Sequence, residues 1–193
     1  PGSGGYGTLI TIDGTNLLGG GSITNSISLD GTVVDEVVSQ SNDRLVVIAA
    51  MSNGQPGVGD IRIVADSGAF IVGTGDWEYL ANPVVDTLTP AAGTIGTRVA
   101  IPGQRLLGGG ATILEVTLAG VAVERIVDSS NSVVNVIAGS SAAQTGLVQL
   151  VSDSGAIITS DASAWQYVDA GDIQNVVPAF GQYGTHVTIS GIN

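Results

Sequence analysis

Cysteine and lysine are both absent from this chain of 193 residues. The lack of cysteine excludes disulfides, thiolate nucleophiles and cysteine-based zinc sites. The lack of lysine excludes isopeptide crosslinks between lysine and asparagine. We therefore expect the fold to be stabilised by core packing and by contacts between repeats or between chains.

Positive charge is also scarce. The five cationic side chains are all arginines, and the net charge is −12. Nucleic-acid binding depends on neutralised phosphates and anionic membranes attract basic segments, so the sequence disfavours both as partners. Charged residues make up 11% of the chain, against roughly 25% in typical globular domains. Such a surface favours burial in an assembly or a coat of sugar.

Long apolar runs and N-glycosylation sequons are missing as well. The longest apolar run, Leu45 to Met51, is too short to cross a bilayer, so membrane insertion is not expected. Without an Asn-x-Ser/Thr sequon, any glycan would be O-linked to Ser or Thr. The chain opens with neither Met nor a signal sequence, and we expect it to be a mature or excised segment.

The chain does contain a long internal repeat. PGSGGYGTLITIDGTNLLGGG from Pro1 recurs as PAAGTIGTRVAIPGQRLLGGG from Pro90, and its first part recurs as PAFGQYGTHVTISGIN from Pro178. Further along, SNDRLVVIA matches SNSVVNVIA, IVADSGAFI matches LVSDSGAII, and WEYL matches WQYV. We predict a first unit at 1–82 that lacks its leading strand, a complete second unit at 83–170, and the opening strands of a third at 171–193.

Each unit consists of short apolar or alternating runs separated by clusters of Gly, Asn, Asp and Ser, without a sustained helical period. Seven or eight strands in about 88 residues predict an all-β fold of tandem Ig-like sandwiches, arranged as beads on a string. In the second unit the expected strands are Val84–Leu88, Thr97–Ile101, Ile113–Leu118, Ala122–Val127, Val133–Ala138, Leu147–Val151, Ala156–Thr159 and Trp165–Val168.

Two recurring motifs have the chemistry of turns. SDSGA at Ser152 to Ala156, with its counterpart at Ala65 to Ala69, places Asp, Ser and Gly between two apolar runs and predicts a hairpin. In LLGGG, we expect the leucines to close one end of the sandwich while the glycines adopt backbone angles that other residues resist.

The order of these motifs, from the glycine-rich opening through the SN turn and the DSG hairpin to the closing aromatic strand, resembles IPT/TIG repeats. That family of Ig-like domains occurs in plexin-type receptors, in Rel-type transcription factors and in arrays on secreted and surface proteins. The cysteines common in the receptor versions are absent here and nothing matches a DNA-contacting loop, so the resemblance implies the surface-array role. It rests most strongly on Pro90, Gly93, Gly96, Thr97, Gly103 and Leu106, which match Pro1, Gly4, Gly7, Thr8, Gly14 and Leu17.

Comparison of the units argues against catalysis. The single histidine, His186, corresponds to Leu9 and Arg98, and the acidic pair Asp35 and Glu36 corresponds to Glu124 and Arg125. No convergent set of ionisable groups recurs, so we expect no enzyme activity, no cofactor and no metal.

Three further features have both a structural and a binding interpretation. Asp66 and Asp153 do recur and are weak ligand candidates, although an aspartate before Ser-Gly is typical of a turn. Trp77 with Tyr79, and Trp165 with Tyr167, would share one face of a strand, where they form either a core or a sugar-stacking surface. LLGGG lacks the Gly-Lys-Ser/Thr of a phosphate loop.

Our leading functional hypothesis is a structural segment of an extracellular filament or cell-surface appendage, with copies of itself or neighbouring repeats as partners. The segment 171–193 would complete the first domain of a neighbouring chain by strand addition, or would simply continue into the next repeat. Its candidate assembly residues are Ile173, Val176, Val177, Val187 and Ile189.

Two alternatives remain open. The first is an adhesin stalk or receptor ectodomain that recognises a protein or glycan through loop tips, with the loop at Met51 to Asp60 as the first place to look. The second is an accessory domain of a secreted polysaccharide-active enzyme.

Overall fold

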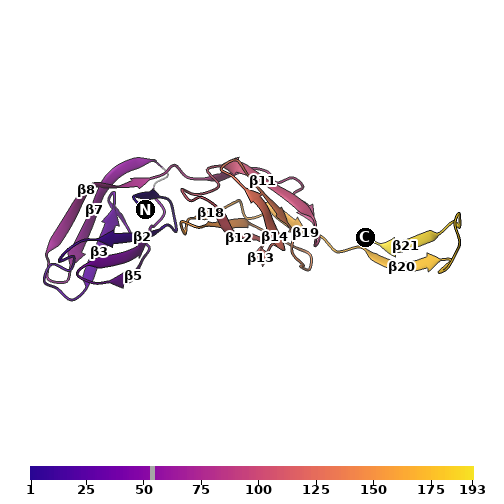
Figure 1. Cartoon of the computed structure of the whole chain (residues 1–193), viewed down its shortest axis with the longest axis horizontal. Coiled ribbons are helices and arrows are strands. Elements are labelled where there is room, and N and C mark those ends of the chain that lie inside the picture. The colour runs from indigo at the N-terminus through magenta and orange to yellow at the C-terminus, as the bar shows by residue number, and fades with distance from the viewer. Residues whose placement is uncertain (53–54) are drawn as a thin grey trace.

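The computed structural model describes residues 1–52 and 55–193, and in those ranges it contains strands and turns but no helix. The prediction of an all-β fold is confirmed. Figure 1 shows two sandwiches, one after the other, and a two-stranded hairpin beyond the second. We call residues 1–79 domain 1, residues 83–167 domain 2, and the hairpin from Asp172 to Ile192 the tail hairpin.

Domain 1 packs two sheets against each other. One sheet has the strand order β1-β8-β7-β3-β4 and the other the order β2-β6-β5. Their strands are β1 (Ser3–Gly4), β2 (Leu9–Asp13), β3 (Thr24–Leu29), β4 (Thr32–Val33), β5 (Glu36–Gln40), β6 (Arg44–Ile48), β7 (Gly57–Ala65) and β8 (Phe70–Tyr79).

Domain 2 repeats this arrangement with two differences. The sheet β14-β15-β11 gains an extra edge strand, β9, and the long strands β7 and β8 of domain 1 are each represented by two shorter strands. Its strands are β9 (Val84–Val85), β10 (Ala92–Gly93), β11 (Arg98–Gln104), β12 (Ile113–Leu118), β13 (Val121–Ala122), β14 (Arg125–Ser129), β15 (Val133–Ile137), β16 (Gln144–Gly146), β17 (Val148–Ser152), β18 (Ile157–Thr159) and β19 (Trp165–Tyr167).

One expected strand is divided in the structure. The run Ala122–Val127 belongs partly to β13 and partly to β14, which lie in different sheets. Between them the Val123 amide donates to the Val116 carbonyl and the Glu124 amide donates to the Ile137 carbonyl, 3.1 and 2.8 Å away. The chain therefore crosses from one sheet to the other within this run, while its apolar pattern continues unbroken.

The expected loop at Met51 to Asp60 is shorter than predicted. The strand β7 already begins at Gly57, so Asp60 lies within this strand, at the bulge between Gly59 and Ile61. Of the remaining loop, Asn53 and Gly54 lie outside the described residues.

Each sandwich encloses one apolar core. Alternate strand residues from both sheets are buried, as the pleat of a half-exposed sheet requires. In domain 2 the core includes Leu88, Val99, Ile101, Leu106, Leu118, Val134, Val136, Leu150, Trp165 and Tyr167, and in domain 1 it includes Ile10, Leu17, Ile27, Leu29, Leu45, Val47, Ile63, Trp77 and Tyr79.

The recurring Gly-Thr pair forms the same turn at the start of all three units. The hydroxyl of Thr8 is 3.1 Å from the Gly5 amide and accepts its hydrogen bond. The hydroxyls of Thr97 and Thr185 accept in the same way from amides three residues earlier. The segment after Pro178 thus forms the same turn as the openings of domains 1 and 2.

Candidate functional site at the junction between the tandem domains

Domains 1 and 2 are joined by backbone hydrogen bonds between segments distant in sequence. The Leu9 amide donates to the Ser154 carbonyl, 3.0 Å away, and the Ile157 amide donates to the Tyr6 carbonyl, 2.9 Å away. The hairpin that follows β17 therefore docks onto the start of β2. Because both bonds use main-chain atoms, they fix the distance between the two domains at this point.

Two glycines allow this close approach. A Cβ atom on Gly7 would lie 2.8 Å from the Gly155 carbonyl oxygen, and a Cβ on Gly155 would lie 2.9 Å from that of Gly7. Both residues also have positive φ angles, +84° and +86°. Any other residue at either position would push the domains apart and strain the backbone.

The short linker between the domains is held by an arginine. The Arg105 guanidinium donates from Nε to the carbonyls of Ala81 and Asn82, at 3.2 and 3.0 Å, and from Nη2 to the carbonyl of Asn82, at 2.7 Å. Beside these contacts lies a cleft of about 100 Å³ lined by residues of both domains, including Tyr6, Met51, Pro83 and Ile157. The junction is thus fastened both at the hairpin and at the linker.

Each of the two candidate aspartates connects its own hairpin to the residues that follow LLGGG. Asp153 Oδ1 accepts hydrogen bonds from the Ala111 and Thr112 amides, at 2.9 and 3.4 Å, and from the Ser152 hydroxyl, at 3.1 Å. In domain 1, Asp66 Oδ1 accepts from the Ser22 amide at 2.9 Å. The hydrogen bonds that Asp153 accepts, chiefly the one from the Ala111 amide, lower the pKa of its carboxyl group. The structure therefore gives both side chains a turn-stabilising position.

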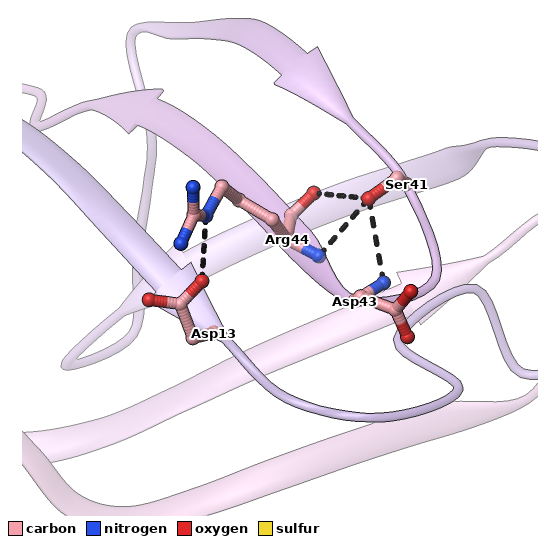
Figure 2. Close-up of polar contacts among 4 residues, drawn as sticks. All are labelled: Asp13, Ser41, Asp43 and Arg44. Atoms are coloured by element: carbon pink, nitrogen blue, oxygen red, sulfur yellow. Dashed lines mark hydrogen bonds and ion pairs between the residues drawn. The ribbon is translucent and has the colours of Figure 1, made fainter.

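The SN turns support the neighbouring LLGGG loops. Ser41 Oγ accepts from the Arg44 and Asp43 amides and donates to the Arg44 carbonyl, as Figure 2 shows. The next residue, Asn42, accepts from the Leu18 amide through its side chain. Asn131 contacts Leu107 in the same way in domain 2. The turn thus holds the glycine loop at the end of each sandwich.

The ion pair in Figure 2 does not recur. Arg44 Nε lies 2.6 Å from Asp13 Oδ1, and both side chains are largely exposed. Their counterparts in domain 2 are Val133 and Pro102. An exposed pair of this kind contributes little to stability, so the repeat depends on the turn and not on the charges.

The aromatic pairs lie inside the sandwiches. Trp77 and Tyr79 pack edge to face with ring centroids 5.5 Å apart, and Trp165 and Tyr167 repeat this geometry. All four side chains are buried, and burial raises the pKa of both tyrosines. They belong to the core and offer no stacking surface to a sugar.

The remaining candidates are dispersed. His186 is exposed just before β21 (Thr188–Ile192), and Asp35 and Glu36 are exposed at the start of β5. Among the described residues, no group of three or more histidine and acidic side chains could hold a metal ion. The candidate assembly residues Ile173, Val176, Val177, Val187 and Ile189 are all exposed in the tail hairpin.

Sequence reasoning did not identify the junction itself. Its hydrogen bonds are made by main-chain atoms of Tyr6, Leu9, Ser154 and Ile157, which carry no side-chain signature. The recurring Gly7 and Gly155 were the available signal, because a glycine kept in every unit often marks a close approach. The Arg105 contacts had no such signal, since the corresponding residue in domain 1 is Asn16.

The family model of the IPT/TIG domain matches residues 1–79 and 83–167. This chain belongs to the IPT/TIG family. The resemblance seen in the sequence is confirmed, and both sandwiches are IPT/TIG domains. Such domains are generally non-catalytic. A search of curated proteins finds no match.

Among solved structures, the IPT/TIG pair is similar to the full extracellular region of plexin A4, domains 1 to 10, with 21% identity and a TM-score of 0.55 over 92% of this chain. A second structure of the plexin A4 extracellular region gives 21% identity and a TM-score of 0.50 over 87% of the chain. The chain spans only 16% and 17% of these two plexin chains. At this identity the likeness shows the fold.

A third similar structure is SGBP-B from the mixed-linkage glucan utilization locus of Bacteroides ovatus, in complex with a mixed-linkage heptasaccharide. It is 14% identical, with a TM-score of 0.38, over 91% of this chain and 45% of that one. Within the described ranges, the IPT/TIG chain has no helix long and apolar enough to span a membrane.

Proposed function

We propose that this chain is a stalk segment of an extracellular or cell-surface protein, in which IPT/TIG domains are held in a fixed relative orientation. The observation that carries the proposal is the junction. Two main-chain hydrogen bonds and the Arg105 contacts lock together domains that a linker alone would leave free. The plexin A4 structures, which are extracellular regions, support an outside location.

A stalk is favoured over a filament subunit as the primary role. The junction lies between domains of one chain and so needs no second molecule to form. An O-linked glycan coat on Ser and Thr is compatible with the low surface charge. Partners on this proposal are neighbouring repeats of the same protein.

Spin-label distance measurements test the stalk, because the cysteine-free chain accepts labels at chosen positions. With labels at Glu36→Cys in domain 1 and Glu124→Cys in domain 2, both exposed, we expect one narrow distance distribution. Gly155→Val should broaden it, because the added side chain meets Gly7. Gly68→Val is the matched control, since Gly68 has a similar φ of +85° and open space around it. A broad distribution in the parent chain would contradict the proposal.

Recognition of a protein or glycan through loop tips is a second candidate role. Met51 favours it, because this side chain is 64% exposed and lines the cleft between the domains. A glycan array and a pull-down with the parent chain and a Met51→Ser variant test this role. Binding by the parent chain that Met51→Ser loses would support this role. No binding by either protein would contradict it.

A further inference from the structure

The chain contains a single sulfur atom, and this atom belongs to a residue at the junction between the two domains. There is no cysteine and one methionine, Met51. Its side chain is 64% exposed, whereas both tryptophans are buried. An oxidant in solution must reach the side chain on which it acts. A mild oxidant should therefore act on this chain at Met51 first.

Main-chain hydrogen bonds hold Met51 beside the docking surface of domain 1. Two residues before it, the Ala49 carbonyl accepts from the Gly7 amide at 3.0 Å, and the Ala49 amide donates to the Thr8 carbonyl at 2.9 Å. Gly7 is the residue that lies against Gly155 in the junction. The chain that leaves β6 thus runs next to the surface onto which the hairpin of domain 2 docks.

Met51 lines the cleft between the domains together with apolar residues from across the junction. Domain 2 contributes Ile157 to this cleft, and the linker contributes Pro83. Both residues are half-buried, so the cleft offers apolar surface to the Met51 side chain. Ile157 is also the residue whose amide donates to the Tyr6 carbonyl. The thioether therefore lies beside one of the two hydrogen bonds that fasten the domains together.

Oxidation of Met51 changes the polarity of this cleft. The sulfur lone pair attacks one oxygen of a hydroperoxide, the O–O bond breaks and an S–O bond forms. The released hydroxide or alkoxide takes up a proton and leaves as water or alcohol, so the sulfur loses the two electrons that the peroxide gains. A sulfoxide is polar where the thioether is apolar. It therefore favours contact with water over contact with the apolar surface of Ile157 and Pro83.

The fold of domain 1 should tolerate a polar group at this position. The residue that corresponds to Met51 in domain 2 is Ser140, which is polar and exposed. Met51 itself does not belong to the apolar core of domain 1. Oxidation should therefore act on the junction and leave each sandwich folded.

We propose that Met51 is an oxidation site for hydroperoxides and that its sulfoxide loosens the junction between the two domains. Reduction of the sulfoxide restores the fixed orientation of the domains. This inference rests on the proposed stalk role, since it adds a reversible means of changing the stiffness of the stalk.

Peptide mass mapping of the full chain after mild hydrogen peroxide treatment tests the modification site. Met51 should gain one oxygen atom at a rate within about tenfold of that of N-acetylmethionine amide, because its side chain is largely exposed. Met51→Leu is the control, because leucine has a similar volume but no sulfur, and it should gain no oxygen. A Met51 that stays unmodified while the free amide is oxidised would overturn the proposal.

Hydrogen exchange of the junction amides, followed by NMR, tests the loosening. The Leu9 and Ile157 amides donate the two hydrogen bonds between the domains, and they should exchange at least about fivefold faster in the oxidised chain. The Val34 and Val123 amides are bonded within domain 1 and domain 2, and they should keep their rates. Methionine sulfoxide reductases should restore slow exchange at the junction.

Two variants separate the sulfoxide from other effects of peroxide. Met51→Gln carries a polar oxygen without oxidation and should show faster junction exchange in untreated protein, whereas Met51→Leu should keep slow exchange after treatment. Unchanged exchange in the fully oxidised parent chain, or equal acceleration in Met51→Leu, would overturn this proposal alone. Fast exchange of both junction amides in the untreated parent chain would contradict the stalk role and this inference together.

Discussion

Asp153 shows how a single carboxylate can hold a surface loop in place. Its Oδ1 atom accepts from amides about forty positions earlier in the chain, so the side chain connects the LLGGG loop to the docking hairpin. Asp66 repeats the contact with Ser22. The sequence suggested a turn aspartate at both positions, but the distant amides that it binds are visible only once the strands are placed.

The charge on Asp153 makes a pH-dependent contribution to stability. Its pKa is lowered in the folded chain, so the stabilisation is complete above the unfolded value of about 3.9 and is lost as the pH falls through the folded value. Asp153→Asn should lower Tm by a few degrees at pH 7 and flatten the acid limb of the stability curve. Thermal unfolding from pH 2 to 7 measures this.

The exposed Asp169→Asn substitution is the control for the loss of one negative charge. It should leave both Tm and the shape of the acid limb close to those of the parent chain. If Asp153→Asn and Asp169→Asn give the same curve, the hydrogen bonds from Ala111 and Thr112 do not stabilise the charged form.

At the scale of elements, the two sheets that contain β2 and β11 differ in their outer edge. The amide and carbonyl of Ala100 both form hydrogen bonds with Thr89. The amide and carbonyl of Thr11 point to the corresponding side of domain 1, where β2 is the edge strand of its sheet. Proline removes a backbone donor and is tolerated mainly at edges. The same substitution should therefore have unequal effects in the two domains.

Ala100→Pro should destabilise domain 2 by about 1 kcal/mol or more, because the Ala100 amide no longer donates to the Thr89 carbonyl, which is left unpaired. Thr11→Pro should cost domain 1 distinctly less. Urea unfolding followed by the fluorescence of Trp165 and Trp77 reports the two domains. Equal losses would show that the β2 edge is occupied in solution.

Much of this element-level description follows from the sequence. Internal repetition located the strands, the DSG hairpins and the SN turns, because each motif occurs in two independent contexts. The division of Ala122–Val127 between two sheets was not predictable, since Val123 and Glu124 change partners without a break in the apolar pattern. The junction was not predicted, because its hydrogen bonds join main-chain atoms and the recurring Gly7 and Gly155 are the signal that the sequence offers for it.

At the scale of the whole molecule, the chain is two separate cores joined by a small contact. Each core contains a single tryptophan, Trp77 or Trp165, packed on a tyrosine of the same strand. The core of each domain consists of residues of that domain, and the hydrogen bonds from the hairpin to β2 join main-chain atoms. The two domains should therefore unfold in separate transitions.

Trp165→Ala should lower the stability of domain 2 by about 3–5 kcal/mol through the cavity it leaves. Domain 1, followed by the remaining fluorescence of Trp77, should keep most of its stability. Calorimetry should show one transition shifted and one nearly unchanged. A common shift of both would mean that the junction makes the pair a single cooperative unit.

The way Arg105 binds the linker constrains what the linker can be. The guanidinium contacts the linker through the carbonyl oxygens of Ala81 and Asn82, and every amino acid has such an oxygen. Substitutions between the domains are therefore of little consequence, whereas inserting or deleting one residue moves the carbonyls out of reach. In a stack of such repeats, the number of linker residues sets the distance between successive domains, whereas the identity of those residues can vary.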